Sequence, residues 1–473
     1  MRSFRMKSYA PKDFVRQNTE PVGTAAGRRG FLRGSSAVRS IILMWVRKRF
    51  DIGWSDIFYG LAAGLIPGQR ERRNERVCSC WSDADDAIVC LSVRTGFDLL
   101  FQTLALPAGS EVLFSALTIP DMAKIARHHG LTPVPVDLDR EDLKPNIERL
   151  RAAITSKTRM LVVAHLFGTR CDMEPLIALT KEHDILLVED CAQVYDGGKY
   201  QGHPKSDVAM FSFGAIKTAT ALGGGVLIVR DQAVLGRMRR LQEDYPLQDG
   251  MRYLRRLAKY GLMKMGSWQV VFTAIVAGFR LTGRDYDHWM NGLARGFRGD
   301  DLIAMLRHRP ASPLLAVLAR RLSRYNRRRL EVRRRKGLAM LEMLGEQESC
   351  PGSRAPIHSF WVFPVYAELP TVMIELLAAA GFDATQGQSM TVIQKDDPAR
   401  GEDGSSRQLA PVAHDLLEHM VFLPFYPGMS ERGLRKMADV ILDEYPARLA
   451  KMPDKQARSG AGDKAIQSME TAE

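Results

Sequence analysis

The stretch Ile185-Leu186-Leu187-Val188-Glu189-Asp190-Cys191-Ala192-Gln193 decides the fold class, because an uninterrupted apolar run ends here in two carboxylates. A second run, Met210–Phe213, carries a hydroxyl at Ser212 and is followed by Lys217 and the glycines Gly223–Gly225. Short apolar runs bounded by polar residues are typical of strands buried on both faces of a parallel sheet. The ligand site of such a sheet lies at the carboxyl ends of its strands.

Similar runs alternate with helical stretches on both sides of these two motifs. The expected strands are 111–115, 132–138, 160–165, 185–189, 208–213 and 225–229, and the expected helices are 97–106, 120–129, 146–154 and 173–183. This alternation predicts an α/β fold with a mostly parallel central sheet. Strands expected at 360–366 and 421–423, with helices at 371–380 and 430–443, predict a smaller C-terminal α+β domain.

Composition narrows the class of protein. The chain has 473 residues, of which 45% are hydrophobic and 26% charged, as in globular rather than disordered proteins. No run of 18 apolar residues is present, which argues against a transmembrane helix. The six cysteines are scattered, which argues against a disulfide scaffold or a structural zinc site and favours a reducing, cytoplasmic location. We expect no metal.

The net charge of +13 is concentrated in two places. Residues 1–76 hold 16 Lys/Arg against 6 Asp/Glu, and residues 320–336 hold ten Lys/Arg against Glu331 alone. These segments are either solvated helix faces or contacts for an anionic partner. No nucleic-acid-binding motif accompanies them, so we expect no nucleic acid partner. The twin arginines in 27–33 resemble an export signal, but the apolar run that follows is only six residues long.

The same patterns suggest five parts of the chain. A basic N-terminal extension covers 1–80, a large α/β domain with both strand-end motifs 81–240, and a small C-terminal domain 306–450. Between the domains, 241–305 read as an atypical helical insertion, and 310–343 as one long basic helix. The apolar run 266–279 is too short to span a bilayer, so we expect a buried or partner-facing helix, with peripheral contact to a membrane surface as the alternative. The polar tail 451–473 is expected to be disordered.

The polar residues at the strand ends form the set that pyridoxal phosphate needs. A lysine such as Lys217 binds this cofactor as a Schiff base, and a carboxylate such as Asp190 keeps its pyridine nitrogen protonated. Upstream, Arg94-Thr95-Gly96 precede a helix, where backbone N–H groups and the helix dipole favour a phosphate. Each feature alone is common in α/β proteins, and only their combination indicates this chemistry.

In these motifs the sequence resembles the DegT/DnrJ/EryC1/StrS family of aminotransferases. The resemblance rests on Glu189–Gln193, on Ser212-Phe213 with Lys217, and on Gly224-Gly225, together with 109–112, 130–137 and 165–168 in family order. It implies fold type I of the pyridoxal-phosphate transferases and a homodimer. It also implies transfer of an amino group, with glutamate as the expected donor, to a keto sugar that is usually nucleotide-linked. The basic segments would help to hold the nucleotide diphosphate.

The resemblance also implies roles for individual residues. Lys217 matches the Schiff-base lysine and Asp190 the partner of the pyridine nitrogen, so both are expected to be catalytic. Gln193 matches the residue beside the ring hydroxyl, and the phosphate contacts match Ser212, Thr95 and Gly96. A lysine at 217 argues against the related sugar dehydratases, which carry histidine there. The aromatic residue that usually stacks on the cofactor is missing, which leaves Ile119, Met122 or no residue for this role.

Two alternatives remain open at this point. Fold and cofactor do not fix the reaction, so another fold type I activity, such as that of a lyase or decarboxylase, fits the same motifs. A non-catalytic, membrane-associated member of the family would keep the fold without the chemistry. The presence of both Lys217 and Asp190 argues against this second alternative.

Overall fold

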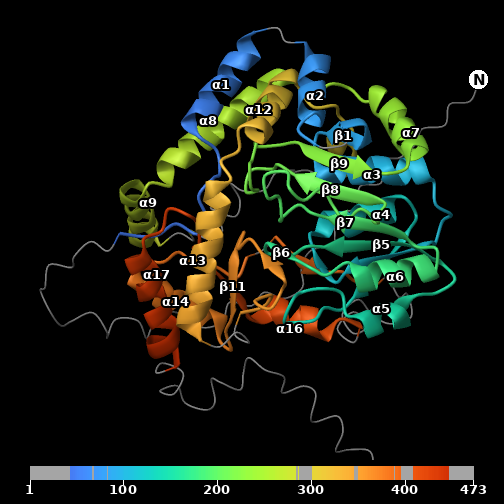
Figure 1. Cartoon of the computed structure of the whole chain (residues 1–473). Coiled ribbons are helices and arrows are strands. Elements are labelled where there is room, and N and C mark those ends of the chain that lie inside the picture. The colour runs from blue at the N-terminus through green and yellow to red at the C-terminus, as the bar shows by residue number, and fades with distance from the viewer. Residues whose placement is uncertain are drawn as a thin grey trace, which may run out of the picture. The chain divides into compact units, whose positions relative to one another are not determined.

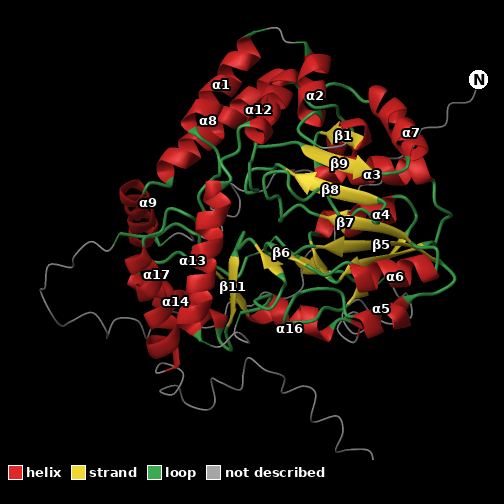
Figure 2. Ribbon diagram, viewed as in Figure 1, coloured by secondary structure: helices red, strands yellow, loops and turns green. Residues whose placement is uncertain are grey.

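The computed structural model describes residues 43–66, 69–81, 84–283, 286, 301–345, 350–387, 389–395 and 409–446. All of them belong to one compact unit, Ile42–Glu473. The predictions for the export-like stretch 27–33 and for the tail 451–473 fall outside the described residues. Figure 1 shows the chain, and Figure 2 shows its helices and strands.

A seven-stranded sheet with the order β1-β9-β8-β7-β5-β2-β4 forms the centre of this unit. Its strands are β1 (Ala87–Cys90), β2 (Glu111–Ser115), β4 (Thr132–Val136), β5 (Thr158–Ala164), β7 (Leu186–Asp190), β8 (Val208–Ser212) and β9 (Gly225–Val229). Strand β9 runs antiparallel to both of its neighbours, β1 and β8, and the pairs from β8 to β4 are parallel. The predicted α/β fold with a mostly parallel sheet is therefore confirmed. Strand β1, which has only four residues, was not among the predicted strands.

Helices cover both faces of the sheet. On one face lie α3 (Val93–Leu104), α4 (Pro120–His128) and α7 (Gln232–Glu243). The other face is covered by α1 (Trp54–Leu65), α2 (Arg70–Cys78), α8 (Gly250–Gly266) and α12 (Ser312–Ser323) near β1, and by α5 (Ile147–Ala153) and α6 (Glu174–Glu182) near β4. Burial on both faces explains why the strands read as continuous apolar runs.

The smaller α+β part is built on the antiparallel pair β11 (Phe363–Tyr366) and β13 (Met420–Leu423). Its helices are α13 (Arg328–Leu344), α14 (Pro370–Ala380), α16 (Pro411–His419) and α17 (Glu431–Asp439). Two short pairs, β3 (Leu117–Thr118) with β12 (Thr391–Val392) and β6 (Thr169–Arg170) with β10 (Ile357–His358), connect this part to the large sheet domain. A five-residue helix, α11 (Leu302–Leu306), precedes α12.

The basic region 310–343 forms two helices, α12 and α13, and not the single helix that the sequence predicts. The break has a local cause at Asn326. Its side-chain oxygen accepts a hydrogen bond from the N–H of Arg328 at 3.1 Å, and its carbonyl accepts one from the N–H of Arg329 at 3.1 Å. An asparagine that satisfies N–H groups in this way favours the start of a new helix.

Helices α8 and α9 (Gln269–Thr282) connect the two parts of the molecule. Helix α8 packs on α1 and α12, whereas Phe272 and Val276 of α9 are buried in the core of the smaller part. The two helices meet at an angle of 88°. Among the described residues, no single helix is long and apolar enough to cross a membrane, although this bent pair passes that test when its two helices are taken together.

Candidate active site

Asp190 is the last residue of β7, and Lys217 follows the end of the neighbouring strand β8. Strands β7 and β8 are parallel, with Asp190 paired to Met210, so the two motifs end at the same edge of the sheet. The Asp190 carboxylate accepts a hydrogen bond from the N–H of Ala192 at 3.0 Å. Burial raises the pKa of Asp190, while this hydrogen bond and the charge of Lys217 oppose the shift.

Lys217 lies at the end of a tight turn that follows β8, in which its N–H donates to the carbonyl of Gly214 at 3.0 Å. Burial lowers the pKa of Lys217 to about 8. The charge of Asp190 acts against this shift, and the charge of Arg94 adds to it. The charges of Asp190 and Lys217 each shift the pKa of the other group. Because β7 and β8 are parallel neighbours, the two segments that the sequence singles out leave the sheet at the same edge.

The start of α3 lies against the start of β9. A Cβ atom on Gly225 would lie 2.5 Å from the backbone nitrogen of Val93, so only glycine permits this approach. Ser212 is paired with Gly225 across β8 and β9, which puts its hydroxyl-bearing strand end beside the helix start. Backbone N–H groups, a helix dipole and a serine at one place form a cradle of the kind that binds phosphate.

Within this cradle the predicted contacts Thr95 and Gly96 lie one turn inside the helix. Ser92 caps α3, and its hydroxyl accepts a hydrogen bond from the N–H of Thr95 at 3.1 Å. The Thr95 hydroxyl donates to the carbonyl of Leu306, and a Cβ on Gly96 would lie 2.2 Å from the Leu227 side chain. The N–H groups of Val93 and Arg94 occupy the first two helical positions, where no intrahelical acceptor exists.

Two arginines add positive charge to this region. Arg94 pairs with Asp121 at 2.5 Å, and its charge reaches both Asp190 and Lys217. Arg256 of α8 donates to the carbonyl of Leu222 at 3.2 Å, next to the glycine cluster. In the sequence, Arg94 stands beside the predicted phosphate contacts Thr95 and Gly96, and the motif by itself implies no role for its side chain. Nothing in the sequence pointed to Arg256, because α8 lies outside every recognised motif.

Gln193 and Trp361 fix the loops around Lys217. The Gln193 side-chain oxygen accepts a hydrogen bond from the N–H of Phe167 at 2.7 Å. From the smaller part, the indole N–H of Trp361 donates to the carbonyl of Ile216 at 3.1 Å, and the Lys217 ammonium nitrogen lies 4.4 Å from the Trp361 ring centroid. Sequence reasoning missed Trp361, which lies far along the chain from every site motif.

The two aliphatic candidates for cofactor stacking differ in exposure. Met122 is 1% exposed and belongs to the core between α4 and the sheet. Ile119 precedes α4, is only partly buried and packs against the same core. Ile119 therefore keeps an accessible surface that Met122 lacks.

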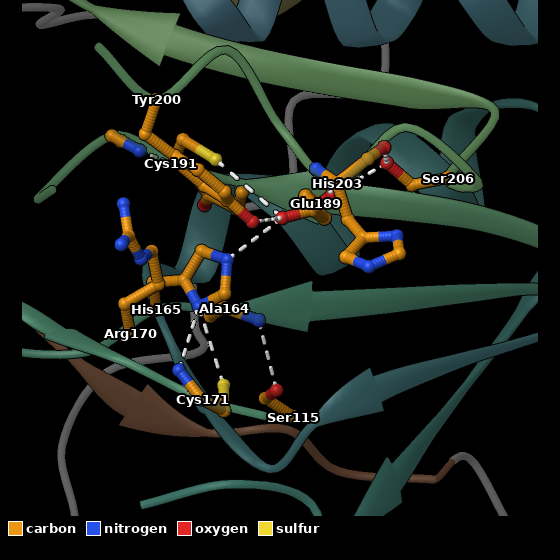
Figure 3. Close-up of polar contacts among 12 residues, drawn as sticks. Ser115, Ala164, His165, Arg170, Cys171, Glu189, Cys191, Tyr200, His203 and Ser206 are labelled. Carbon is orange, nitrogen blue, oxygen red and sulfur yellow. Dashed lines mark hydrogen bonds and ion pairs between the residues drawn. The ribbon is translucent and has the colours of Figure 1, made fainter. Parts of the chain in front are cut away.

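A buried polar network surrounds the Glu189 carboxylate of β7 (Figure 3). The imidazole of His165 contacts the Glu189 carboxylate at 2.9 Å and the Cys171 sulfur at 3.2 Å. Glu189 also accepts hydrogen bonds from the Tyr200 hydroxyl, the N–H of His203 and the Ser206 hydroxyl. His165, Glu189 and Cys191 are residue types that bind metals, and their ligand atoms lie within 4.8 Å of one another. Both carboxylate oxygens of Glu189 nevertheless already accept hydrogen bonds from protein groups.

This network holds an ion pair. Burial alone would raise the pKa of Glu189, but hydrogen bonds from His165, Ser206 and Tyr200 lower it to about 2. Burial alone would lower the pKa of His165, but the neighbouring Cys171 and the hydrogen bonds to Cys171, Cys191 and Glu189 raise it well above the ordinary value. Because Glu189 immediately precedes Asp190, the network fixes the strand end that carries the candidate catalytic carboxylate.

Residues 62–266 match the model of the DegT/DnrJ/EryC1/StrS aminotransferase family, which confirms the resemblance stated from the sequence. The chain is 32% identical over 142 residues to a GDP-perosamine synthase of Escherichia coli O157:H7, covering 29% of this chain and 39% of that protein. It is 26% identical over 386 residues to a UDP-N-acetyl-3-dehydro-alpha-D-glucosamine 3-aminotransferase of Acidithiobacillus ferrooxidans, covering 80% of this chain and 89% of that protein.

Among solved structures, the fold is similar to that of a putative sugar aminotransferase from Streptococcus pneumoniae in its PMP form. The TM-score is 0.60 at 19% identity, and the match covers 86% of this chain and 100% of that one. This likeness confirms the predicted fold class.

Proposed function

We propose that this chain, whose residues 62–266 match the DegT/DnrJ/EryC1/StrS aminotransferase family, is a pyridoxal-phosphate-dependent aminotransferase. The observation that carries the proposal is that the end of β7 with Asp190 and the end of β8 that leads to Lys217 lie at one edge of the sheet, beside the start of α3. Bound pyridoxal phosphate would supply an electron sink for the substrate's α-carbon.

The residues present fit this cofactor. Its phosphate would lie in the cradle formed by the start of α3, Ser212 and Gly225, with Arg94 and Arg256 nearby to balance its charge. Thr95 would act from inside this cradle by holding the helix start in place. Gly96 would act by letting α3 pack on Leu227.

Each candidate catalytic group would have a defined task. Asp190 would face the pyridine nitrogen and keep it protonated, and Gln193 would lie at the ring edge. Lys217 would hold the cofactor through its amine and, once displaced by the substrate, would move the proton at the substrate's α-carbon. A lysine whose pKa is about 8 is suited to this task, because a far larger fraction of its amine is uncharged near neutral pH than at the ordinary lysine pKa of 10.5.

For the substrates, we propose an amino acid donor, with glutamate expected, and a nucleotide-linked keto sugar as acceptor. The support is that the relatives of this chain are named for GDP-linked and UDP-linked sugars. We further propose a cytoplasmic homodimer and the five-part division stated from the sequence, with the site in the 81–240 domain.

Borohydride trapping tests the cofactor and the lysine in one experiment. The protein is incubated with pyridoxal phosphate, reduced with sodium borohydride, digested and analysed by mass spectrometry. We expect the cofactor mass on the peptide that contains Lys217, and no such mass in Lys217→Ala. Labelling that is equal in the two proteins would refute the role of Lys217.

Incubation with glutamate before the reduction tests the reaction type. Transamination would free Lys217 from the cofactor and release 2-oxoglutarate, so the label should disappear while 2-oxoglutarate accumulates in stoichiometric amount. Release of carbon dioxide without a keto acid would instead identify a decarboxylase. Protein that takes up no cofactor would support the non-catalytic alternative.

A further inference from the structure

A cavity of about 200 Å³ opens beside Lys217 and is strongly cationic. Its walls come from the segment 48–51, the turn 216–218, the corner between α8 and α9, helix α13, and the segment 425–428. Besides Lys217, its lining contains five basic residues: Lys48, Arg49, Lys264, Arg329 and Arg333. Asp51 is the one carboxylate among the lining residues.

Asp51 is already engaged by protein groups. Its carboxylate accepts a hydrogen bond from the N–H of Ala219 at 2.9 Å and pairs with Arg329 at 3.0 Å and with Arg321 at 3.6 Å. This arrangement ties the N-terminal segment to the loop that follows Lys217. The other basic residues therefore have no second carboxylate in the cavity lining with which to pair.

The basic groups crowd one another. The Lys48 ammonium nitrogen lies 3.6 Å from the centroid of the Trp361 ring, and Lys217 approaches the same ring at 4.4 Å. Burial and the charges of Arg333 and Lys217 hold the pKa of Lys48 well below its ordinary value. Burial and nearby arginines also lower the pKa of Lys264. A multiply charged anion in the cavity would relieve this repulsion.

The rim of the cavity is apolar on the side of the α8–α9 corner. Trp268 lines the cavity and is 54% exposed. Leu262, Met265 and Val270 flank it in the sequence and are exposed as well. Such a rim suits a group attached to the anion, either a flat nucleobase that stacks on an indole or a hydrocarbon chain.

We infer that this cavity is the subsite for the diphosphate group of the sugar acceptor, and that Lys48, Lys264 and Arg333 are its specificity-determining residues. The inference rests on the proposed aminotransferase function. A diphosphate provides several negative charges for the basic groups, whereas the side-chain carboxylate of an amino donor would leave most of them unpaired. Lys48 and Arg333 lie outside residues 62–266, so the family match does not assign this role to them.

The test is ligand binding to protein whose cofactor has been fixed to Lys217 by borohydride, so that the phosphate cradle is filled. Isothermal titration calorimetry would measure the affinity for inorganic pyrophosphate. We expect Lys48→Ala and Lys264→Ala each to weaken binding about tenfold or more, as for the loss of a charge-assisted hydrogen bond. Lys48→Arg should retain most of the affinity. The control Lys181→Ala, at an exposed position of α6, should bind as the unmodified sequence does.

Three further ligands identify the source of the diphosphate. Tighter binding of UDP or GDP than of pyrophosphate would support a nucleotide-linked acceptor, and tighter binding of farnesyl diphosphate would support a lipid-linked one. Trp268→Ala should remove this gain and leave pyrophosphate binding unchanged. Equal pyrophosphate affinity in the Lys48, Lys264 and control variants, or no binding to any of them, would overturn the subsite.

Thermal unfolding of each variant separates loss of the subsite from loss of the fold. Should Lys48→Ala not fold, Lys264→Ala still decides the outcome, because Lys264 lies on a different element. Failure of the proposed function would be seen separately, as absence of the cofactor label from Lys217. In that event the same pyrophosphate titration on unlabelled protein still tests the cavity.

Discussion

The charge on Lys217 determines when the site can accept its cofactor. Only an uncharged amine attacks an aldehyde, and Lys217 has a pKa of about 8 instead of 10.5. We expect the rate of cofactor attachment to rise with pH and to level off above about 8, as measured by stopped-flow absorbance. Asp190→Asn removes the charge that raises this pKa, so its midpoint should lie at lower pH. A midpoint that stays the same or moves up would contradict the coupling.

Asp190 is expected to affect turnover far more than cofactor attachment. The amide in Asp190→Asn cannot keep the pyridine nitrogen protonated, so we expect turnover to fall by several orders of magnitude, a barrier increase of roughly 4 kcal/mol or more. Steady-state assay of 2-oxoglutarate release measures this, with borohydride labelling of Lys217 to verify that the cofactor is present. Glu182→Gln, an exposed carboxylate on α6, is the control. Turnover near the normal rate would refute the role of Asp190.

Among the elements, the contact between β9 and α3 shapes the phosphate cradle. A methyl group at 225 would meet the backbone of Ser92 and Val93 at 2.5–2.6 Å, and this backbone cannot rotate away as a side chain can. We expect Gly225→Ala to displace the start of α3 and to weaken cofactor binding about tenfold or more, as measured by equilibrium dialysis. Gly278→Ala is the control, because a Cβ at Gly278 of α9 meets nothing within 4 Å. It should leave cofactor binding intact and raise helix stability by about 1 kcal/mol or less.

Helices α8 and α9 show how added elements can alter a site without changing the sheet. Helix α8 brings Arg256 to the glycine cluster, and its end brings Lys264 to the cavity. Trp268, at the corner, then forms part of the cavity rim. The region between β9 and α12 thus contributes to both candidate ligand sites.

Stability of the whole molecule is expected to depend on pH through the buried pair of Glu189 and His165. The pKa of Glu189 is lowered from 4.5 to about 2, so its contribution to folding is present above pH 4.5 and is lost as the pH falls through 2. This pKa shift corresponds to a contribution of roughly 3 kcal/mol to the free energy of unfolding. Urea unfolding at a series of pH values measures it.

Glu189→Gln should be destabilised near neutral pH by about 3–5 kcal/mol, because His165 is then buried without its partner. The free energy of unfolding of this variant should also fall less at low pH, because the Glu189 carboxyl is no longer there to be protonated. The double variant with His165→Gln should lose less than the sum of the two single variants. Strict additivity would show that the pair does not interact.

The local sequence determined the sheet and the central chemical pair. Strand and helix formation follow from hydrophobic patterns a few residues long, and Asp190 and Lys217 are placed by the ends of their own strands. The same local information could not place the phosphate contacts. The start of α3 depends on the Ser92 cap and on the packing of α3 against β9, not on the Arg94-Thr95-Gly96 motif alone.

Tertiary structure alone decided what surrounds this pair. Trp361, Lys48 and Arg256 reach the region of Lys217 from three segments that no pattern connects to it. Their positions depend on the docking of the N-terminal segment, the smaller part and α8 against the sheet. These contacts are long-range and consist of single side chains, so no periodicity in the chain records them.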